Sequence, residues 1–238
     1  MSTPGYFSEN GWRLVDVLHT PERRAEFVSA DDLPLAGQAR TFLDKTYPNG
    51  IYRHQKAALV PALKGTAVCL ATGTASGKSL VFQTAALDLL ENDPEARVMA
   101  IYPMKALSNE QRDRWERALT AAGSSAEVGR IDGNIPPAMR AGILDRSRVV
   151  VFTPDILHAW MFSNLSQPAV LNFLKHTRLV VIDEVHTYTG VFGSNSAFLF
   201  RRLQHILTLL GARPGYIAAS ATIARPAEHL NSLFGFDF

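Results

Sequence analysis

From residue 66 onward, short apolar runs alternate with longer helical stretches, and this alternation limits the fold more than any other feature. A parallel sheet with helices on both faces has this signature, because its strands are buried on two sides and each crossover carries a helix. Six runs qualify as strands: residues 67–71, 97–103, 126–131, 148–153, 178–184 and 215–222. Helices are expected over residues 54–63, 77–90, 106–122, 136–144, 154–160 and 194–210. The sequence therefore predicts an α/β fold with functional residues beyond the carboxyl ends of the strands.

The first part of the chain has a different character. Residues 1–50 contain turn signals such as Thr20-Pro21 and Leu33-Pro34 and only short apolar segments. We interpret them as a short N-terminal extension and residues 51–238 as a single domain. A chain of 238 residues is long enough for one domain with a full core and short for two.

The composition excludes several classes of protein. The single cysteine, Cys69, lies in an apolar run and leaves no disulfide or zinc framework within the chain. No apolar stretch reaches the roughly 18 residues of a membrane span, and the first residues lack the pattern of a secretory signal. We therefore expect a cytoplasmic protein with no membrane partner. The net charge of +2 is too small to indicate a nucleic-acid partner by itself, so such a partner must be argued from sequence motifs and their positions.

The segment AVCLATGTASGKSLVFQ at residues 67–83 has the strand, small-residue loop and helix of a phosphate-binding loop. Backbone amides of such a loop close around phosphate oxygens, helped by the helix dipole. Lys78 would reach the β- and γ-phosphates and Ser79 would bind Mg²⁺. The usual pattern has glycine at the position of Thr72, and here Gly73 comes one place late. The candidate nucleotide contacts are Thr72, Gly73, Thr74, Ala75, Ser76, Gly77, Lys78 and Ser79.

Two adjacent carboxylates end the apolar run LVVIDE at residues 179–184. Charged groups at the mouth of a buried strand need a cation or a partner, and Mg²⁺ bound to a triphosphate is a suitable one. We interpret Asp183 as the Mg²⁺ ligand. Glu184 would orient and deprotonate an attacking water, which indicates hydrolysis rather than kinase chemistry. The predicted catalytic residues are therefore Lys78, Asp183 and Glu184.

Several motifs occur together in a recognisable order: YRHQ at residues 52–55, TGTASGKS at 72–79, YPMKAL at 102–107, TPD at 153–155, DEVH at 183–186 and SAT at 220–222. In order and spacing they resemble the motifs of superfamily 2 DEAD/DEAH-box helicases. The longer strings YPMKALSNEQ and VIDEVHTYTGVFGSN are similar to the helicase family of bacterial mitomycin repair factor A and its eukaryotic RecQ-like relatives, which are 3′-to-5′ DNA translocases. The resemblance covers about residues 50–232 and implies the first RecA-like, ATP-binding half of such a motor.

The resemblance also implies roles for residues outside the loop. Gln55 matches the glutamine that hydrogen-bonds adenine in ATP. Single-stranded DNA, with RNA as the alternative, would be held through its backbone by Lys105, Arg130, Gly133 and Thr153, with Arg140 a further candidate. His186, Ser220 and Thr222 would couple the γ-phosphate state to the nucleic acid. The stretch 187–195, with two aromatic residues and two glycines, is expected to form a loop beside the active site.

Helicase hydrolysis normally needs a second RecA-like domain that closes on ATP, and no second set of strands is found in this sequence. We therefore expect a fragment or one part of a split motor, which on its own binds ATP weakly and hydrolyses it slowly or not at all. An RNA-directed motor is the nearest alternative. A small-molecule kinase or GTPase is disfavoured because Glu184 favours attack by water and no Asn-Lys-x-Asp signature occurs. A non-catalytic ATP-sensing module is a third alternative.

Overall fold

A six-stranded, wholly parallel sheet forms the centre of the protein, with strand order β3-β8-β7-β4-β6-β5. The computed structural model describes residues 26–73, 76–103, 108–221 and 223–238. The strands are β3 (Val68–Ala71), β4 (Arg97–Ile101), β5 (Glu127–Ile131), β6 (Ser147–Phe152), β7 (Thr177–Ile182) and β8 (Gly215–Ser220). A separate antiparallel pair joins β1 (Phe27–Val28) to β2 (Ile51–Tyr52). The predicted α/β fold and its six strands are confirmed.

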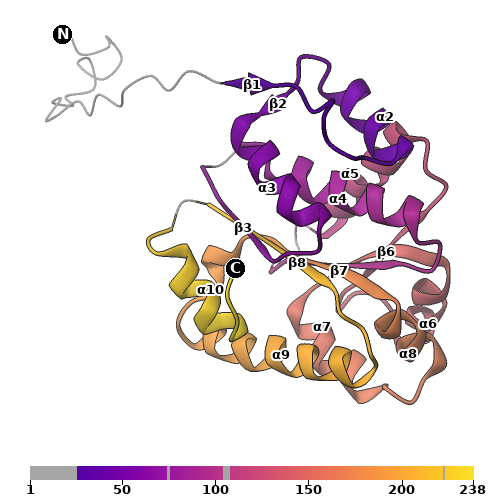
Figure 1. Ribbon diagram of the computed structural model, residues 1–238. Coiled ribbons are helices and arrows are strands. Elements are labelled where there is room, and N and C mark those ends of the chain that lie inside the picture. Colours follow the sequence, from indigo (N-terminus) through magenta and orange to yellow (C-terminus); the bar gives the residue numbers. More distant parts are fainter. Residues whose placement is uncertain (1–25, 74–75, 104–107, 222) are drawn as a thin grey trace, which may run out of the picture.

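Helices cover both faces of the sheet (Figure 1). One layer contains α2 (Gly37–Thr46), α3 (Arg53–Leu63), α4 (Lys78–Asn92) and α5 (Ser108–Ala122). The other contains α6 (Pro137–Arg146), α7 (Pro154–Ala159), α8 (Pro168–Lys175), α9 (Gly190–Leu209) and α10 (Pro226–Phe234). None of these described helices is long and apolar enough to cross a membrane.

The sheet divides the interior into two apolar clusters. Side chains alternate between the two faces of a strand, so Val98 and Ala100 of β4 pack with the first helical layer. Met99 and Ile101 of the same strand pack with the second layer. All four side chains are fully buried. This two-sided burial explains why the strands read as unbroken apolar runs instead of an alternating pattern.

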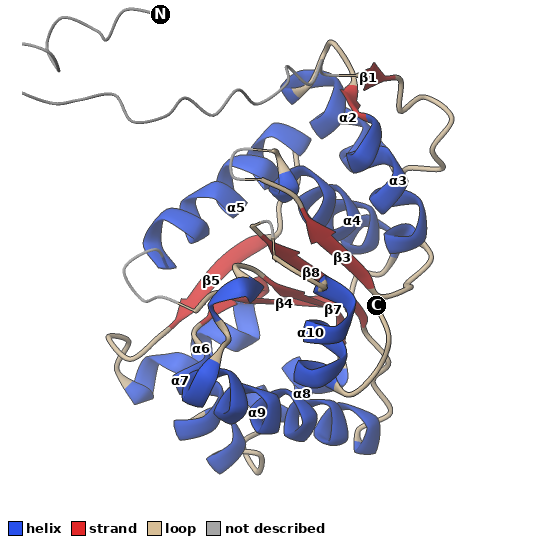
Figure 2. Ribbon diagram, turned by 90° about the vertical axis from the view of Figure 1, so that its left-hand side faces the viewer, coloured by secondary structure: helices blue, strands red, loops and turns tan. Residues whose placement is uncertain are grey.

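All six carboxyl ends of the strands lie at one edge of the sheet because the strands are parallel (Figure 2). The residues that directly follow the strands are Thr72, Tyr102, Asp132, Thr153, Asp183 and Ala221. Segments far apart in the sequence therefore meet at this edge, as expected for an open α/β sheet.

The prediction of a loop over residues 187–195 is wrong from Gly190 onward. Helix α9 begins at Gly190, one turn earlier than the expected start at residue 194. Glycines in the segment suggested a loop, yet Gly193 is helical and lies close to the chain before the helix. A Cβ atom there would be 2.5 Å from the carbonyl oxygen of Tyr188. Only glycine allows this approach without a shift of the backbone.

Part of the expected N-terminal extension packs into the first cluster. Ala39, Phe42 and Leu43 of α2 are buried, and α2 contacts α4 and α5. Residues 1–25 lie outside the described residues. The predicted boundary near residue 50 stays a prediction.

Candidate functional site

The loop between β3 and α4 is shaped around Gly77, which has a left-handed conformation with φ 72° directly before α4. A Cβ atom at this position would lie 2.4 Å from Nε2 of Gln55. The positive φ favours glycine here, and a larger residue would also displace the Gln55 side chain from its bonds to the loop. Thr74 and Ala75 lie outside the described residues, whereas Ser79 belongs to the first turn of α4.

The Lys78 side chain reaches back over the loop. Its Nζ donates to the carbonyl oxygens of Thr72 and Gly73, at 3.0 and 2.9 Å. The hydroxyls of Thr72 and Ser76 are 2.6 Å apart and close the loop from the other side. The ammonium group and the N-terminal amides of α4 thus concentrate positive charge where a phosphate-binding loop needs it.

Gln55 supports this loop from α3. Its Oε1 accepts from the Tyr52 amide at 2.8 Å, and its Nε2 donates to the carbonyl oxygens of Ser76 and Gly77 at 3.2 and 2.9 Å. The side chain is buried. The sequence had suggested a contact with adenine, which stays a prediction, and had missed this contact with the loop.

Asp183 follows β7 and is almost buried, with 9% exposure. Its amide donates to the Ile101 carbonyl at 3.0 Å, and its Oδ1 accepts from the Glu184 amide at 2.8 Å. Burial raises the pKa of Asp183 to about 6, while the charges of Lys78 and Arg114 partly oppose the increase. The carboxylate is therefore costly to ionise in the bare protein, and a bound cation would relieve that cost.

Glu184 has a left-handed backbone with φ 53° and ψ 42°, which is unusual for a residue with a side chain. Its carbonyl accepts from both the amide and the hydroxyl of Thr187, at 2.9 and 2.8 Å. These two bonds close a 3-10 turn over Val185–Thr187. The turn fixes a strained conformation at a candidate catalytic residue.

His186 lies between Glu184 and the end of β8. Its Nδ1 is 3.3 Å from Oε2 of Glu184 and 3.4 Å from the amide of Ala221. An unprotonated Nδ1 accepts from the amide, whereas a protonated Nδ1 can donate to the carboxylate. The buried hydroxyl of Ser220 has no hydrogen-bond partner among the described atoms, and Thr222 lies outside them. The coupling role of these residues stays a prediction.

The expected nucleic-acid contacts lie farther along the same edge. Gly133 is exposed, and Arg130 is paired with Asn109 and lies 3.5 Å from the buried carboxylate of Asp132. Thr153 is fully buried, so its hydroxyl cannot reach a nucleic-acid strand. A contact with the sugar-phosphate backbone of the strand would have to come from the first turn of α7. Lys105 lies outside the described residues. These assignments stay predictions.

Arg140 does not fit the role of a surface contact. It is buried, donates to the Ile135 carbonyl at 2.9 Å and lies over the Trp160 ring at 5.4 Å. Arg114, in contrast, was not selected from the sequence, although its charge lowers the pKa of Asp183. One arginine in a charged amphipathic helix carries no sequence signal that separates it from its neighbours.

The chain matches the family model described as DEAD/DEAH box helicase over residues 52–230. It is 37% identical to the ATP-dependent helicase HRQ1 of Saccharomyces cerevisiae, over 78% of this chain and 18% of that protein. It is 35% identical to the uncharacterized ATP-dependent helicase MJ1574 of Methanocaldococcus jannaschii, over 94% of this chain and 33% of that protein. The chain thus spans between 18% and 33% of the length of these curated relatives.

Among solved structures, the chain is similar to the DUF1998 helicase MrfA bound to DNA and AMPPNP. The TM-score is 0.84 with 30% identity, over 90% of this chain and 30% of that one. The DEAD-box helicase Mss116 bound to single-stranded RNA has a TM-score of 0.71 at 17% identity, which shows the shared fold alone.

Proposed function

Since this chain belongs to the DEAD/DEAH box helicase family, we propose that it is the ATP-binding half of an ATP-dependent DNA helicase or translocase. The observation that supports the proposal is that the loop of Lys78 and the Asp183–Glu184 pair follow β3 and β7 at the same edge of the sheet. The charge of Lys78 accordingly lowers the pKa of Asp183. A cation beside a buried carboxylate and a strained glutamate suits a magnesium triphosphate. The DNA and AMPPNP bound to MrfA support DNA and ATP as the ligands.

Each group then has a defined task. Lys78 binds the β- and γ-phosphates, and Glu184 orients the attacking water and takes its proton. Ser79 and Asp183 would hold Mg²⁺, which neutralises phosphate charge when bound. Among the described residues, no three His, Cys, Asp or Glu side chains form a group that could hold a metal. Phosphate oxygens would therefore complete the shell, as is usual for Mg²⁺.

The nucleic acid would cross the same edge. Lys105, Arg130, Gly133 and the Thr153 end of α7 would contact the backbone of single-stranded DNA, and His186 would pass the state of Glu184 to the end of β8. We place the activity in 3′-to-5′ translocation during DNA repair or defence. A second RecA-like domain, in the same or another chain, would supply further cations to the transition state.

Binding and single-turnover hydrolysis of ATP by the 238-residue chain test the catalytic assignment. We expect Lys78→Ala to abolish binding of a fluorescent ATP analogue. Glu184→Gln should bind it normally and hydrolyse ATP at least about 100-fold more slowly, because the water loses its base. Equal hydrolysis rates for Glu184→Gln and wild type would refute the role of Glu184.

The choice of nucleic acid and the need for a second domain are tested separately. We expect tighter binding to single-stranded DNA than to RNA of the same sequence, measured by fluorescence anisotropy. The reverse preference would favour an RNA-directed motor. Full DNA-stimulated steady-state turnover by the 238 residues alone would contradict the need for a second RecA-like domain.

A further inference from the structure

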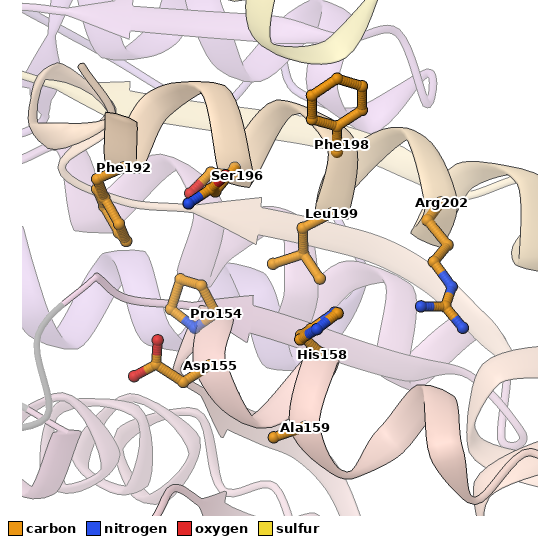
Figure 3. A pocket seen from close by; sticks show the side chains of 10 residues that line it. Pro154, Asp155, His158, Ala159, Phe192, Ser196, Phe198, Leu199 and Arg202 are labelled. Carbon is orange, nitrogen blue, oxygen red and sulfur yellow. The ribbon is translucent and has the colours of Figure 1, made fainter. Parts of the chain in front are cut away.

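A groove between α7 and α9 lies next to the proposed DNA path and has no role in the site described above. It has a volume of about 640 Å³ and is lined by Asp155 and His158 from α7 and by Phe192, Phe198 and Arg202 from α9. Figure 3 shows Phe192 beside Pro154 at one end of the groove and Arg202 at the other, whereas the ring of Phe198 points away from α7. The groove begins where α7 starts, directly after Thr153.

The exposed face of α9 combines apolar groups with positive charge. Val191 is 79% exposed, Phe198 is 74% exposed and Leu209 is 73% exposed, although such side chains are usually buried. The helix also carries Arg201, Arg202 and His205 but no aspartate or glutamate. An aromatic surface with cations and no acidic residue of its own complements an aromatic, anionic ligand.

Phe192 is held as a fixed platform at the inner end of the groove. Its ring stacks on Tyr188 with centroids 5.1 Å apart and planes at 16°, and Tyr188 in turn packs edge-on against Phe200 at 5.5 Å. Because Phe192 also lines the groove, its ring joins the buried Tyr188 to the groove surface. A ring supported in this way loses little side-chain freedom when a ligand stacks nearby.

The far end of the groove presents a cation. Arg202 lies over the ring of Phe162, with Cζ 4.9 Å from the ring centroid, and this contact orients its guanidinium. The carboxylate of Asp155 is a hydrogen-bond acceptor, suited to an exocyclic amino group of a base and unsuited to a phosphate. The groove thus offers the ring of Phe192, a hydrogen-bond acceptor and a phosphate-binding cation.

We propose that this groove binds the single-stranded nucleic acid, with a base stacked beside Phe192 and a phosphate farther along the strand on Arg202. The inference rests on the proposed function, because it continues the DNA path from the start of α7. An acidic protein helix would match the charge equally well. A nucleic-acid strand is favoured because the groove adjoins the expected phosphate contacts and combines aromatic rings with a cation, as single-strand binding surfaces do.

The stacked pair also connects the groove to the ATP site. The Tyr188 hydroxyl is buried and has no hydrogen-bond partner among the described atoms. Burial raises its pKa far above the usual range, and the charges of Asp183 and Asp155 add to the increase. Tyr188 thus joins the ring of Phe192 to the buried region at the carboxyl end of β7.

The test measures the fluorescence anisotropy of a labelled deoxycytidine oligonucleotide, whose bases carry exocyclic amino groups, and of an abasic oligonucleotide of equal length and charge. We expect wild type to bind the normal strand more tightly than the abasic one. In Phe192→Ala the affinity for the normal strand should fall on the order of tenfold and the preference for bases should shrink. Arg202→Gln should weaken the binding of both strands. Leu209 is an exposed apolar residue near the other end of the same helix, and Leu209→Ala should leave both affinities unchanged.

The possible failures are distinguishable. If wild type binds neither strand, the nucleic-acid part of the proposed function fails and the groove proposal fails with it. If wild type binds but Phe192→Ala keeps the full preference for bases, only the groove proposal is overturned. Loss of self-association in Phe192→Ala with unchanged DNA binding would identify a protein interface and would also overturn it. Thermal melting and ATP-analogue binding check that each variant is folded.

Discussion

The ionised carboxylate of Asp183 makes the bare protein less stable than it could be. Its pKa of about 6 in the folded chain exceeds the ordinary value of 3.8, so the folded chain binds this proton more tightly than the unfolded chain. By linkage, stability falls as pH rises from the ordinary value through the folded one, and the deficit at pH 7 is roughly 3 kcal/mol. The protein thus keeps a carboxylate proposed to bind the metal, although this carboxylate lowers the free energy of unfolding.

We therefore expect Asp183→Asn to raise the free energy of unfolding at pH 7 by on the order of 1–3 kcal/mol, measured by urea unfolding without metal or nucleotide. The same variant should lose magnesium-dependent ATP binding. The gain should shrink as pH falls through about 6, because the folded wild type then takes up the proton. A gain that stays constant from pH 7 to pH 5 would contradict the assignment.

Thr187 is a positioning residue for Glu184, since its amide and hydroxyl both bind the carbonyl of that left-handed residue. We expect Thr187→Val to lower the rate constant of ATP hydrolysis by about tenfold, with little change in ATP affinity, because one of two bonds that fix Glu184 is lost. Thr187→Ser keeps the hydroxyl and should restore the rate. Equal losses in Thr187→Val and Thr187→Ser would show that packing, not this bond, is responsible.

Among the elements, α9 depends on one close approach. Gly193→Ala would place a Cβ atom 2.5 Å from the Tyr188 carbonyl, which is backbone and cannot simply turn away. We expect a loss of roughly 1–3 kcal/mol in unfolding free energy, measured in urea.

Gly142→Ala in α6 is the matched control, because its nearest neighbour is the flexible end of Arg146 at 3.6 Å. That change should stabilise by about 0.5–1 kcal/mol, as alanine does in helices. Similar effects of both substitutions would contradict the close approach.

The elements also show which features the sequence could predict. Strands buried on both faces must be apolar throughout, so β4, β6 and β7 were found within two residues of their ends. The start of α9 was missed because glycine signals a loop locally, whereas Gly193 is required by a contact outside the helix. Strand order was not predicted, because parallel strands expose no local signal of their neighbours. The groove between α7 and α9 was missed for the same reason.

At the scale of the site, sequence patterns identified residues whose chemistry is unusual for their position. Asp183 and Glu184 follow an apolar strand, and the small residues before Lys78 follow another, so both were selected from the pattern alone. Gln55 was selected through family resemblance, but its hydrogen bonds to Ser76 and Gly77 depend on how α3 packs beside the loop. The left-handed backbone of Glu184 could not be predicted from the sequence, because glutamate is not a residue type that favours a positive φ.

Across the whole molecule, the first apolar cluster extends from the sheet into the segment before residue 50. Helix α2 has no side-chain cap of its own. Instead, Asp88 and Glu91 of α4 accept from the amides of Ala36 and Gln38 at 2.7 and 2.5 Å. Two carboxylates from a neighbouring helix thus satisfy amides at the start of α2 and interact favourably with its dipole. Together with its buried apolar side chains, these contacts join α2 to the ATP-binding fold.

Phe42 provides the test of this connection, because it is 3% exposed and packs in the cluster shared with α4 and α5. We expect Phe42→Ala to lower the free energy of unfolding by about 3–5 kcal/mol in a single cooperative transition, measured by calorimetry and by circular dichroism. Phe27, at 52% exposure, is the matched control, and Phe27→Ala should cost far less. If residues 26–50 were instead a detachable extension, Phe42→Ala would leave the main transition in place. ATP-analogue binding would then persist to the same temperature as in wild type, since the loop at Lys78 would not depend on α2.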